Sequence, residues 1–145
     1  RIIESTEELG RERIAPLGST PHTRGGAITR AAAEIGEILG VKYLVTFTQS
    51  GDSARRMSRL RSALPLLAFT PDAAVRNVLS LTWGTQSYEV PSVDSTDAMV
   101  RQVDTTLQAN GLAETGDLVV VVAGAPVGVA GTTNSILVHR IGDEL

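Results

Sequence analysis

The chain contains no cysteine, and it has only two histidines. Without cysteine there is no disulfide, no thiol nucleophile and no cysteine-ligated zinc. Two histidines are too few for a histidine-rich metal site, so we expect no metal site. The lack of disulfides agrees with a cytoplasmic protein. At 145 residues one domain can bury roughly 70% of the surface that its unfolded chain exposes, which is enough to fold without such cross-links.

Basic residues do not outnumber acidic ones either. The 13 Lys and Arg stand against 16 Asp and Glu, which gives a net charge of -3. This balance lacks the electrostatic footprint of a protein that binds duplex nucleic acid or an anionic membrane. Long hydrophobic runs are lacking too, because residues 118–124 fall far short of the roughly 20 residues of a membrane-spanning helix. We expect neither nucleic acid nor a membrane as a partner.

What the sequence does have is an alternation of amphipathic helical stretches and short apolar runs, which is typical of an α/β domain. The loop over residues 124–133 is too short for a helical crossover, so the strand after it should run antiparallel and lie at an edge. We therefore predict a three-layer α/β/α sandwich with a five-stranded mixed sheet whose last strand is antiparallel. The expected helices cover 28–39, 52–64, 72–81 and 94–110, and the expected strands cover 41–47, 66–69, 85–90, 118–122 and 135–141.

Local signals mark several of these ends. Gly40 is expected to cap the first helix in a left-handed conformation. Thr70 is expected to be the N-cap of the third helix, with Pro71 at its first position. Residues 1–21 have no clear place in this pattern and are interpreted as a junction segment, and residues 22–145 as one domain.

The turn over residues 48–53, which leaves the first strand and enters a helix, has the best chemistry for a site. It holds the hydroxyls of Thr48, Ser50 and Ser53, together with Gln49, Gly51 and Asp52. In open α/β sheets ligands bind at such strand ends, and free N–H groups at a helix start attract phosphate. Arg56, near the helix start, is placed to reach such a ligand. In the other interpretation Ser50 only caps the helix and the turn binds nothing, and spacing does not decide between the two.

A glycine-rich loop over residues 124–134 is the second candidate. It matches neither a P-loop nor a dinucleotide fingerprint, because a strand follows it rather than a helix. It is either a hairpin connection or a loop that closes over a ligand of the 48–53 turn, to which Gly131 and Thr132 would then contribute. Ser50 lacks the surroundings of a nucleophilic serine, and neither His22 nor His139 has a recognisable partner. We therefore expect no catalytic residue.

Five stretches, in this order and spacing, resemble the C-terminal domain of pyruvate kinase in the form found in bacteria such as actinobacteria. They are residues 28–33, 47–53, 65–72, 83–84 and above all 124–134, and the likeness runs from about residue 23 to the end. The resemblance implies regulation rather than catalysis. In that family phosphoryl transfer from phosphoenolpyruvate to ADP occurs on a separate barrel domain, which also holds the magnesium and potassium ions. No cofactor and no activity of its own are expected for this chain.

The resemblance also implies a ligand. Thr48, Ser50, Gly51 and Ser53 match the family's effector-phosphate turn, whereas Asp52 departs from versions with a basic residue there. The loop residues 125–127 lack the Trp and Arg of forms that respond to fructose 1,6-bisphosphate. We therefore expect a monophosphate effector such as glucose 6-phosphate, ribose 5-phosphate or AMP. The implied partners are the parent barrel domain and, because the family is tetrameric, a second copy at the last strand.

Two other hypotheses stay open at this point. The chain could be an assembly module without a ligand, in which the 48–53 turn only starts a helix and the last strand mediates dimers. It could also be a small free-standing enzyme on a Rossmann-like sheet, although the missing metal carboxylates and basic phosphate clamps argue against that.

Overall fold

A computed structural model describes residues 22–124, 127, 129 and 133–144 of the chain. The junction predicted for residues 1–21 lies outside this part, so that interpretation stays a prediction. The described part contains four helices and five strands. They are α2 (Arg24–Leu39), β1 (Tyr43–Phe47), α3 (Asp52–Arg59), β2 (Leu66–Thr70), α4 (Ala73–Leu79), β3 (Thr85–Glu89), α5 (Thr96–Ala109), β4 (Leu118–Gly124) and β5 (Thr133–Arg140).

The five strands form one sheet in the order β3-β2-β1-β4-β5. The first four are parallel, and β5 pairs antiparallel with β4, so the predicted mixed sheet is confirmed. The central strand β1 has Val45 opposite Leu67 of β2 and Val121 of β4. Because β1 and β4 are neighbours, the turn after β1 and the loop after β4 leave the sheet at the same end.

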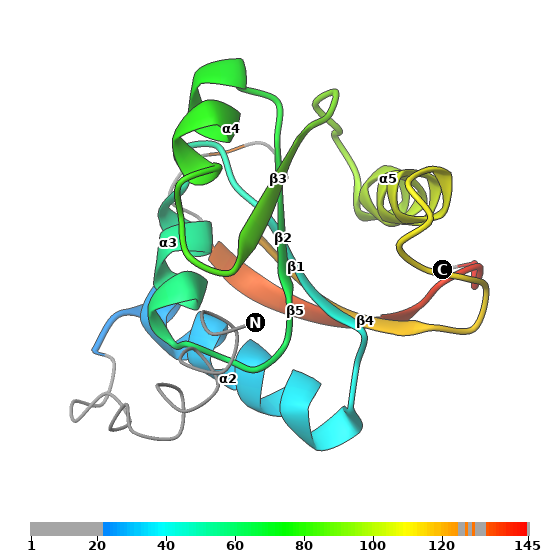
Figure 1. Cartoon of the computed structure of the whole chain (residues 1–145), viewed down its shortest axis with the longest axis horizontal. Coiled ribbons are helices and arrows are strands. Elements are labelled where there is room, and N and C mark those ends of the chain that lie inside the picture. The colour runs from blue at the N-terminus through cyan, green and yellow to red at the C-terminus, as the bar shows by residue number, and fades with distance from the viewer. Residues whose placement is uncertain (1–21, 125–126, 128, 130–132, 145) are drawn as a thin grey trace, which may run out of the picture.

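Helices cover both faces of the sheet, as the predicted three-layer sandwich requires (Figure 1). Alternate residues of each strand point to opposite faces, and the buried ones divide into separate clusters. On one face α5 packs on Val45, Leu67, Phe69, Val119 and Val121 through Met99, Val103 and Leu107. On the other face α2 and α3 pack on Leu44, Leu66, Val120 and Val122, and α4 packs with α3 over Ala68.

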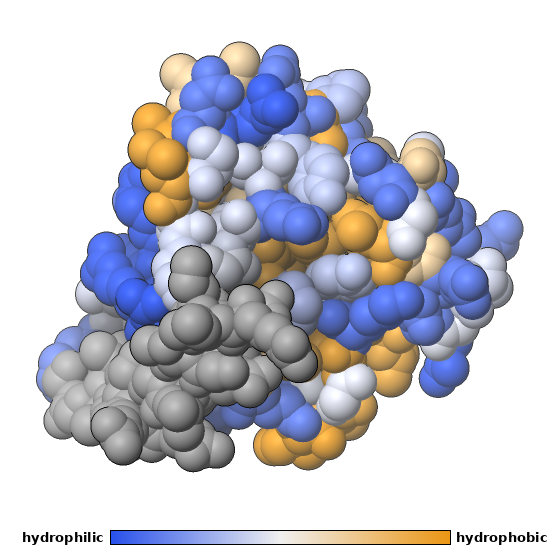
Figure 2. Space-filling view, viewed as in Figure 1, coloured by the Kyte–Doolittle hydropathy of each residue, from blue (hydrophilic) through white to orange (hydrophobic). Residues whose placement is uncertain are grey.

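Figure 2 shows hydrophilic residues beside a group of apolar ones on the surface around α4. A few large apolar side chains are exposed. Ile38, near the end of α2, is 83% exposed, and Leu81, just after α4, is 90% exposed. Scattered apolar residues of this kind are normal on soluble domains.

The helix caps agree with the sequence in one place and differ in another. Gly40 takes a left-handed conformation with φ of 63°, as predicted for the end of α2. At α4 the N-cap is Asp72, not Thr70, so the predicted cap was wrong. Asp72 Oδ1 accepts hydrogen bonds from the backbone N–H groups of Ala74 and Val75 at 2.8 and 3.2 Å. Thr70 stays in β2, where it pairs with β3 and is fully buried.

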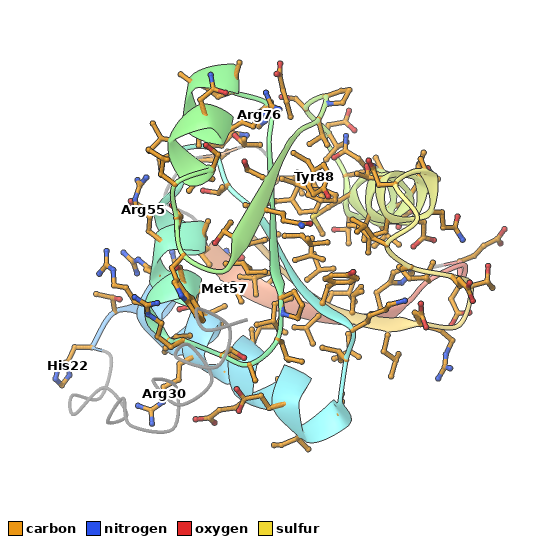
Figure 3. The ribbon with its side chains drawn as sticks, viewed as in Figure 1. His22, Arg30, Arg55, Met57, Arg76 and Tyr88 are labelled. Atoms are coloured by element: carbon orange, nitrogen blue, oxygen red, sulfur yellow. The ribbon has the colours of Figure 1, made fainter. Side chains whose placement is uncertain are left out.

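Helix α3 is shorter than predicted, because it ends at Arg59 rather than at residue 64. Met57 points from it toward the sheet (Figure 3). Beyond the helix Arg61 has a positive φ of 51°, which an arginine seldom adopts. Its guanidinium lies 4.3 Å from the ring centroid of Trp83, and Ser58 Oγ donates to Trp83 O at 2.7 Å. These contacts join the end of α3 to the segment before β3.

Candidate functional site

A cavity of about 270 Å³ lies at the carboxyl ends of the parallel strands. The ends of β1, β2 and β4 contribute Phe47, Phe69 and Ala123 to its wall, and Val90 follows β3. This is the place where open α/β sheets bind ligands. Of the predicted site residues, the cavity brings together Thr48, Gln49, Ser50, Asp52, Ser53 and Arg56.

The hydroxyl of Thr48, the first residue of the 48–53 turn, holds this turn in place. Thr48 is 7% exposed, and its Oγ1 accepts a 2.8 Å hydrogen bond from Gly51 N. Gly51 is the N-cap of α3, with φ of 90° and no side chain to cap with. Ser50 Oγ accepts only a long 3.4 Å bond from Asp52 N. Ser50 is therefore not the N-cap that the alternative interpretation assumed, although its hydroxyl does stay close to the helix start.

The first turn of α3 offers backbone donors. No acceptor is found within the described part of the chain for the N–H groups of Ser53 and Ala54, as is usual at a helix start. The Ser53 side chain is buried, and its Oγ lies 2.6 Å from Thr133 Oγ1 at the start of β5. Free amides and the positive end of the helix dipole together favour an anion at this position.

A second helix start reaches the same cavity. Thr23 caps α2 by accepting from Gly26 N at 3.1 Å, and Arg56 Nη1 donates to the same Thr23 Oγ1 at 3.1 Å. Thr23, Arg24 and Gly25 line the cavity, and the sequence reasoning missed all three. A hydroxyl directly before a helical pattern is an N-cap signal that could have found Thr23. Within the described residues neither Arg24 nor Arg56 forms an ion pair.

The opposite wall of the cavity is apolar and was also missed. It is built from Phe47 and Phe69, whose rings meet edge to face at 5.2 Å, and from residues 90–93 after β3. Gln102 Nε2 donates to Pro91 O at 2.8 Å and so fixes this segment to α5. In the sequence, the only indication that residues 90–93 belong to the site is that they directly follow a parallel strand. A ligand in the cavity would thus meet donors on one side and hydrocarbon on the other.

The glycine-rich loop reaches the cavity through its described residues. Val127 and Val129 line it, as does Thr133 at the end of the loop. Gly131 and Thr132, the two loop residues predicted for the site, lie outside the described part of the chain, so their role stays a prediction.

The described residues contain no group of three acidic or histidine side chains that could hold a metal ion, and none of their helices is long and apolar enough to cross a bilayer. His139 does have a partner that the sequence did not reveal. It is 3% exposed, and its Nε2 donates to Asp104 Oδ1 of α5 at 2.7 Å. The His139 side chain is therefore held inside the domain, against α5.

The chain matches the family model described as "Pyruvate kinase, alpha/beta domain" over residues 26–139. It is 52% identical over 144 residues to a pyruvate kinase of Mycobacterium tuberculosis, covering 99% of this chain and 30% of that protein. It is 54% identical to the pyruvate kinase of Mycobacterium intracellulare and 48% identical to that of Corynebacterium efficiens, with the same coverage. The chain thus spans under a third of the length of these relatives.

Solved structures agree on the fold. A pyruvate kinase from Cryptosporidium parvum superposes with a TM-score of 0.75 at 20% identity, covering 95% of this chain and 26% of that one. The same score is found for the Cryptosporidium parvum enzyme in complex with ADP, at 21% identity and with 95% and 27% coverage.

Proposed function

The chain belongs to the pyruvate kinase family, in which it corresponds to the alpha/beta domain, and from this premise we propose that it regulates and assembles such an enzyme. The parent reaction, phosphoryl transfer from phosphoenolpyruvate to ADP, would take place on the remaining part of the enzyme, together with its magnesium and potassium ions. This domain would bind a phosphorylated effector in the cytoplasm and perform no chemistry itself.

The observation that carries the proposal is the composition of one wall of the cavity. The unpaired N–H group of Ser53, the hydroxyl of Ser50 and the guanidinium of Arg56 belong to residues that line that side, and the N–H of Ala54 follows in the same helical turn behind them. Hydrogen bonds to a charged group are each worth about 1.5–3 kcal/mol. Three or four of them would hold a metabolite phosphate in a site that is open to solvent.

The remaining walls support a small effector with a single phosphate. A volume of about 270 Å³ lies at the low end of ligand pockets, which run from about 300 to 1,000 Å³. Arg24 and Arg56 are the only cations among the described residues that line the cavity, and the apolar wall of Phe47, Phe69 and residues 90–93 offers none to a second phosphate. Glucose 6-phosphate, ribose 5-phosphate and AMP are therefore the effectors that we propose, in preference to fructose 1,6-bisphosphate.

Calorimetric titration of the chain with these compounds tests the proposal. We expect at least one of the three monophosphates to bind saturably, and its phosphate-free counterpart, glucose, ribose or adenosine, to bind far more weakly. Equal affinity for a monophosphate and its counterpart would remove the phosphate from the interaction. Such binding changes the activity of a parent enzyme only if the cavity differs between two states of that enzyme.

The last strand supports the second part of the proposal, which is assembly with another copy of the chain. β5 is the outer strand of the sheet after β4, and Val138 in its middle is 43% exposed. An edge strand presents backbone donors and acceptors to which another strand can pair. An assembly module without any ligand remains the alternative function, and the titration above distinguishes the two.

A further inference from the structure

One residue of the proposed phosphate site has the wrong charge for it. Asp52 lies in the first turn of α3, and it is the only acidic residue among those described that line the cavity. A carboxylate there interacts favourably with the same helix dipole that would attract a phosphate. It would also repel a phosphate dianion a few ångströms away. The site needs something that removes this repulsion.

Arg55 is positioned to remove it. Its Nη2 lies 3.1 Å from Asp52 Oδ1 and donates to Ser50 O at 2.9 Å, so the guanidinium bridges the carboxylate and the turn. Arg55 is not among the residues that line the cavity. Figure 3 shows it on the outer side of α3, directed away from the sheet. The charge of Asp52 is therefore balanced from outside the cavity.

The turn passes close to this guanidinium. A Cβ atom on Gly51 would lie 2.7 Å from Arg55 Nη1, so a side chain at this position would displace the guanidinium from its present place. On the other side of the same peptide unit, Gly51 N donates to Thr48 Oγ1. The peptide between residues 50 and 51 is thus held at its carbonyl oxygen by Arg55 and at its N–H by Thr48.

We propose that Arg55 is a positioning residue for anion binding: from outside the cavity it neutralises the carboxylate of Asp52 and holds it in the 3.1 Å ion pair, so that a phosphate can occupy the helix start. This inference rests on the proposed function of the cavity. The Asp52 side chain is 66% exposed, and exposed ion pairs contribute little to stability. The effect should therefore appear in ligand affinity rather than in folding.

The test is calorimetric titration of the whole chain with glucose 6-phosphate and with AMP. We compare wild type with Arg55→Ala, Asp52→Asn and the double variant. Arg59→Ala is the matched control, because it removes the same charge from the same helix at an exposed position without a described partner. We expect Arg55→Ala to bind about tenfold more weakly, the size expected for one carboxylate near a dianion in water. The double variant should return to within about twofold of wild type, because its carboxylate is gone.

The salt dependence gives a second readout. The affinity difference between wild type and Arg55→Ala should shrink when the ionic strength is raised from about 0.05 M to about 0.5 M. Wild-type affinity in Arg55→Ala, a double variant as weak as Arg55→Ala, or an equal loss in Arg59→Ala would each overturn the inference while leaving the proposed function intact. If wild type binds neither compound, the proposed function fails and the inference fails with it.

Discussion

The hydroxyl oxygens of Ser53 and Thr133 lie 2.6 Å apart, although 80 positions separate the two residues in the chain. Ser53 belongs to the first turn of α3, and Thr133 is the first residue of β5. Both line the cavity. The hydrogen bond therefore joins the proposed phosphate turn to the strand at which we propose that a second copy binds.

Removing either hydroxyl should weaken this connection. We expect Ser53→Ala and Thr133→Val each to lower the free energy of unfolding by about 1 kcal/mol, because each deletes one partner of a largely buried hydrogen bond. The double variant should lose little more than either single one, since the two residues share the interaction. Urea unfolding measures all three. Thr105→Val, at an exposed position of α5, is the control and should change little. Fully additive losses would show that the hydroxyls act independently.

If two copies of the chain assemble by pairing their β5 strands, a charged side chain on β5 should keep the chain monomeric. Val138→Lys places an ammonium on the half-exposed middle of the strand, where natural edge strands use lysine to prevent pairing. In light scattering at about 100 µM protomer, where a weak dimer is populated, wild type should be a dimer or larger and the variant a monomer. Val78→Lys, at a 57% exposed valine of α4, should assemble like wild type. A monomeric wild type at this concentration contradicts the proposed assembly.

The buried pair of His139 and Asp104 predicts a larger stability effect. Asp104 Oδ1 accepts from His139, and its Oδ2 accepts from Gly142 N at 3.1 Å. Asp104→Ala leaves the imidazole without its partner inside the protein, which costs about 2–3 kcal/mol. Thermal and urea unfolding should show this loss, whereas Asp94→Ala, at an exposed position, should stay within about 0.5 kcal/mol of wild type. Equal stability of the two variants would mean that the pair contributes nothing.

Asp117 should make the stability of the fold depend on pH in the acidic range. The backbone N–H of Glu114 and the ammonium of Lys42 both bind its Oδ2, at 2.8 and 3.1 Å, and lower the pKa of Asp117 below its usual value. A carboxyl with a lowered pKa in the folded state stabilises the protein above its unfolded pKa of about 3.9 and loses that contribution as the pH falls through the folded value.

Asp117→Asn should therefore be less stable than wild type at neutral pH, and the difference should shrink as the pH falls below the unfolded pKa of about 3.9 and through the lowered folded pKa. Unfolding midpoints recorded from about pH 7 to about pH 2.5 measure it. Because Lys42 is exposed and Asp117 is only half-buried, the difference should be small. A difference that stays constant over the whole range would show that the carboxylate charge is not its cause.

The sheet could be predicted from the sequence because its inner strands are continuous apolar runs. Leu67 and Val120, for example, are both fully buried, and a run of such residues has few other places in an α/β domain. The start of α4 could not be fixed, because Thr70 and Asp72 are both good N-caps. The pairing of β2 with β3 through Thr70 and Glu89 decided between them, and no local pattern reports such a pairing.

In the candidate site too, some residues could be placed from the sequence and others could not. Residues 48–53 are contiguous, and Arg56 follows one helical turn later, so the sequence was enough to place them together. The contacts of Arg56 with Thr23 and of Ser53 with Thr133 join residues 33 and 80 positions apart. They depend on how α2, α3 and β5 pack, which is a tertiary property without a sequence period. The apolar wall from residues 90–93 was missed for the same reason.

The most direct test of the account is to locate a bound phosphate on the chain. Amide nitrogen–proton correlation spectra should be recorded while AMP or glucose 6-phosphate is titrated in, with adenosine and glucose as controls. If a phosphate binds at the start of α3, saturable shifts should centre on the backbone N–H groups of residues 50–54, with the Arg56 side chain among the affected signals, and the controls should cause no comparable shifts. Saturable binding whose shifts lie away from this turn, or no binding at all, would contradict the proposed phosphate site.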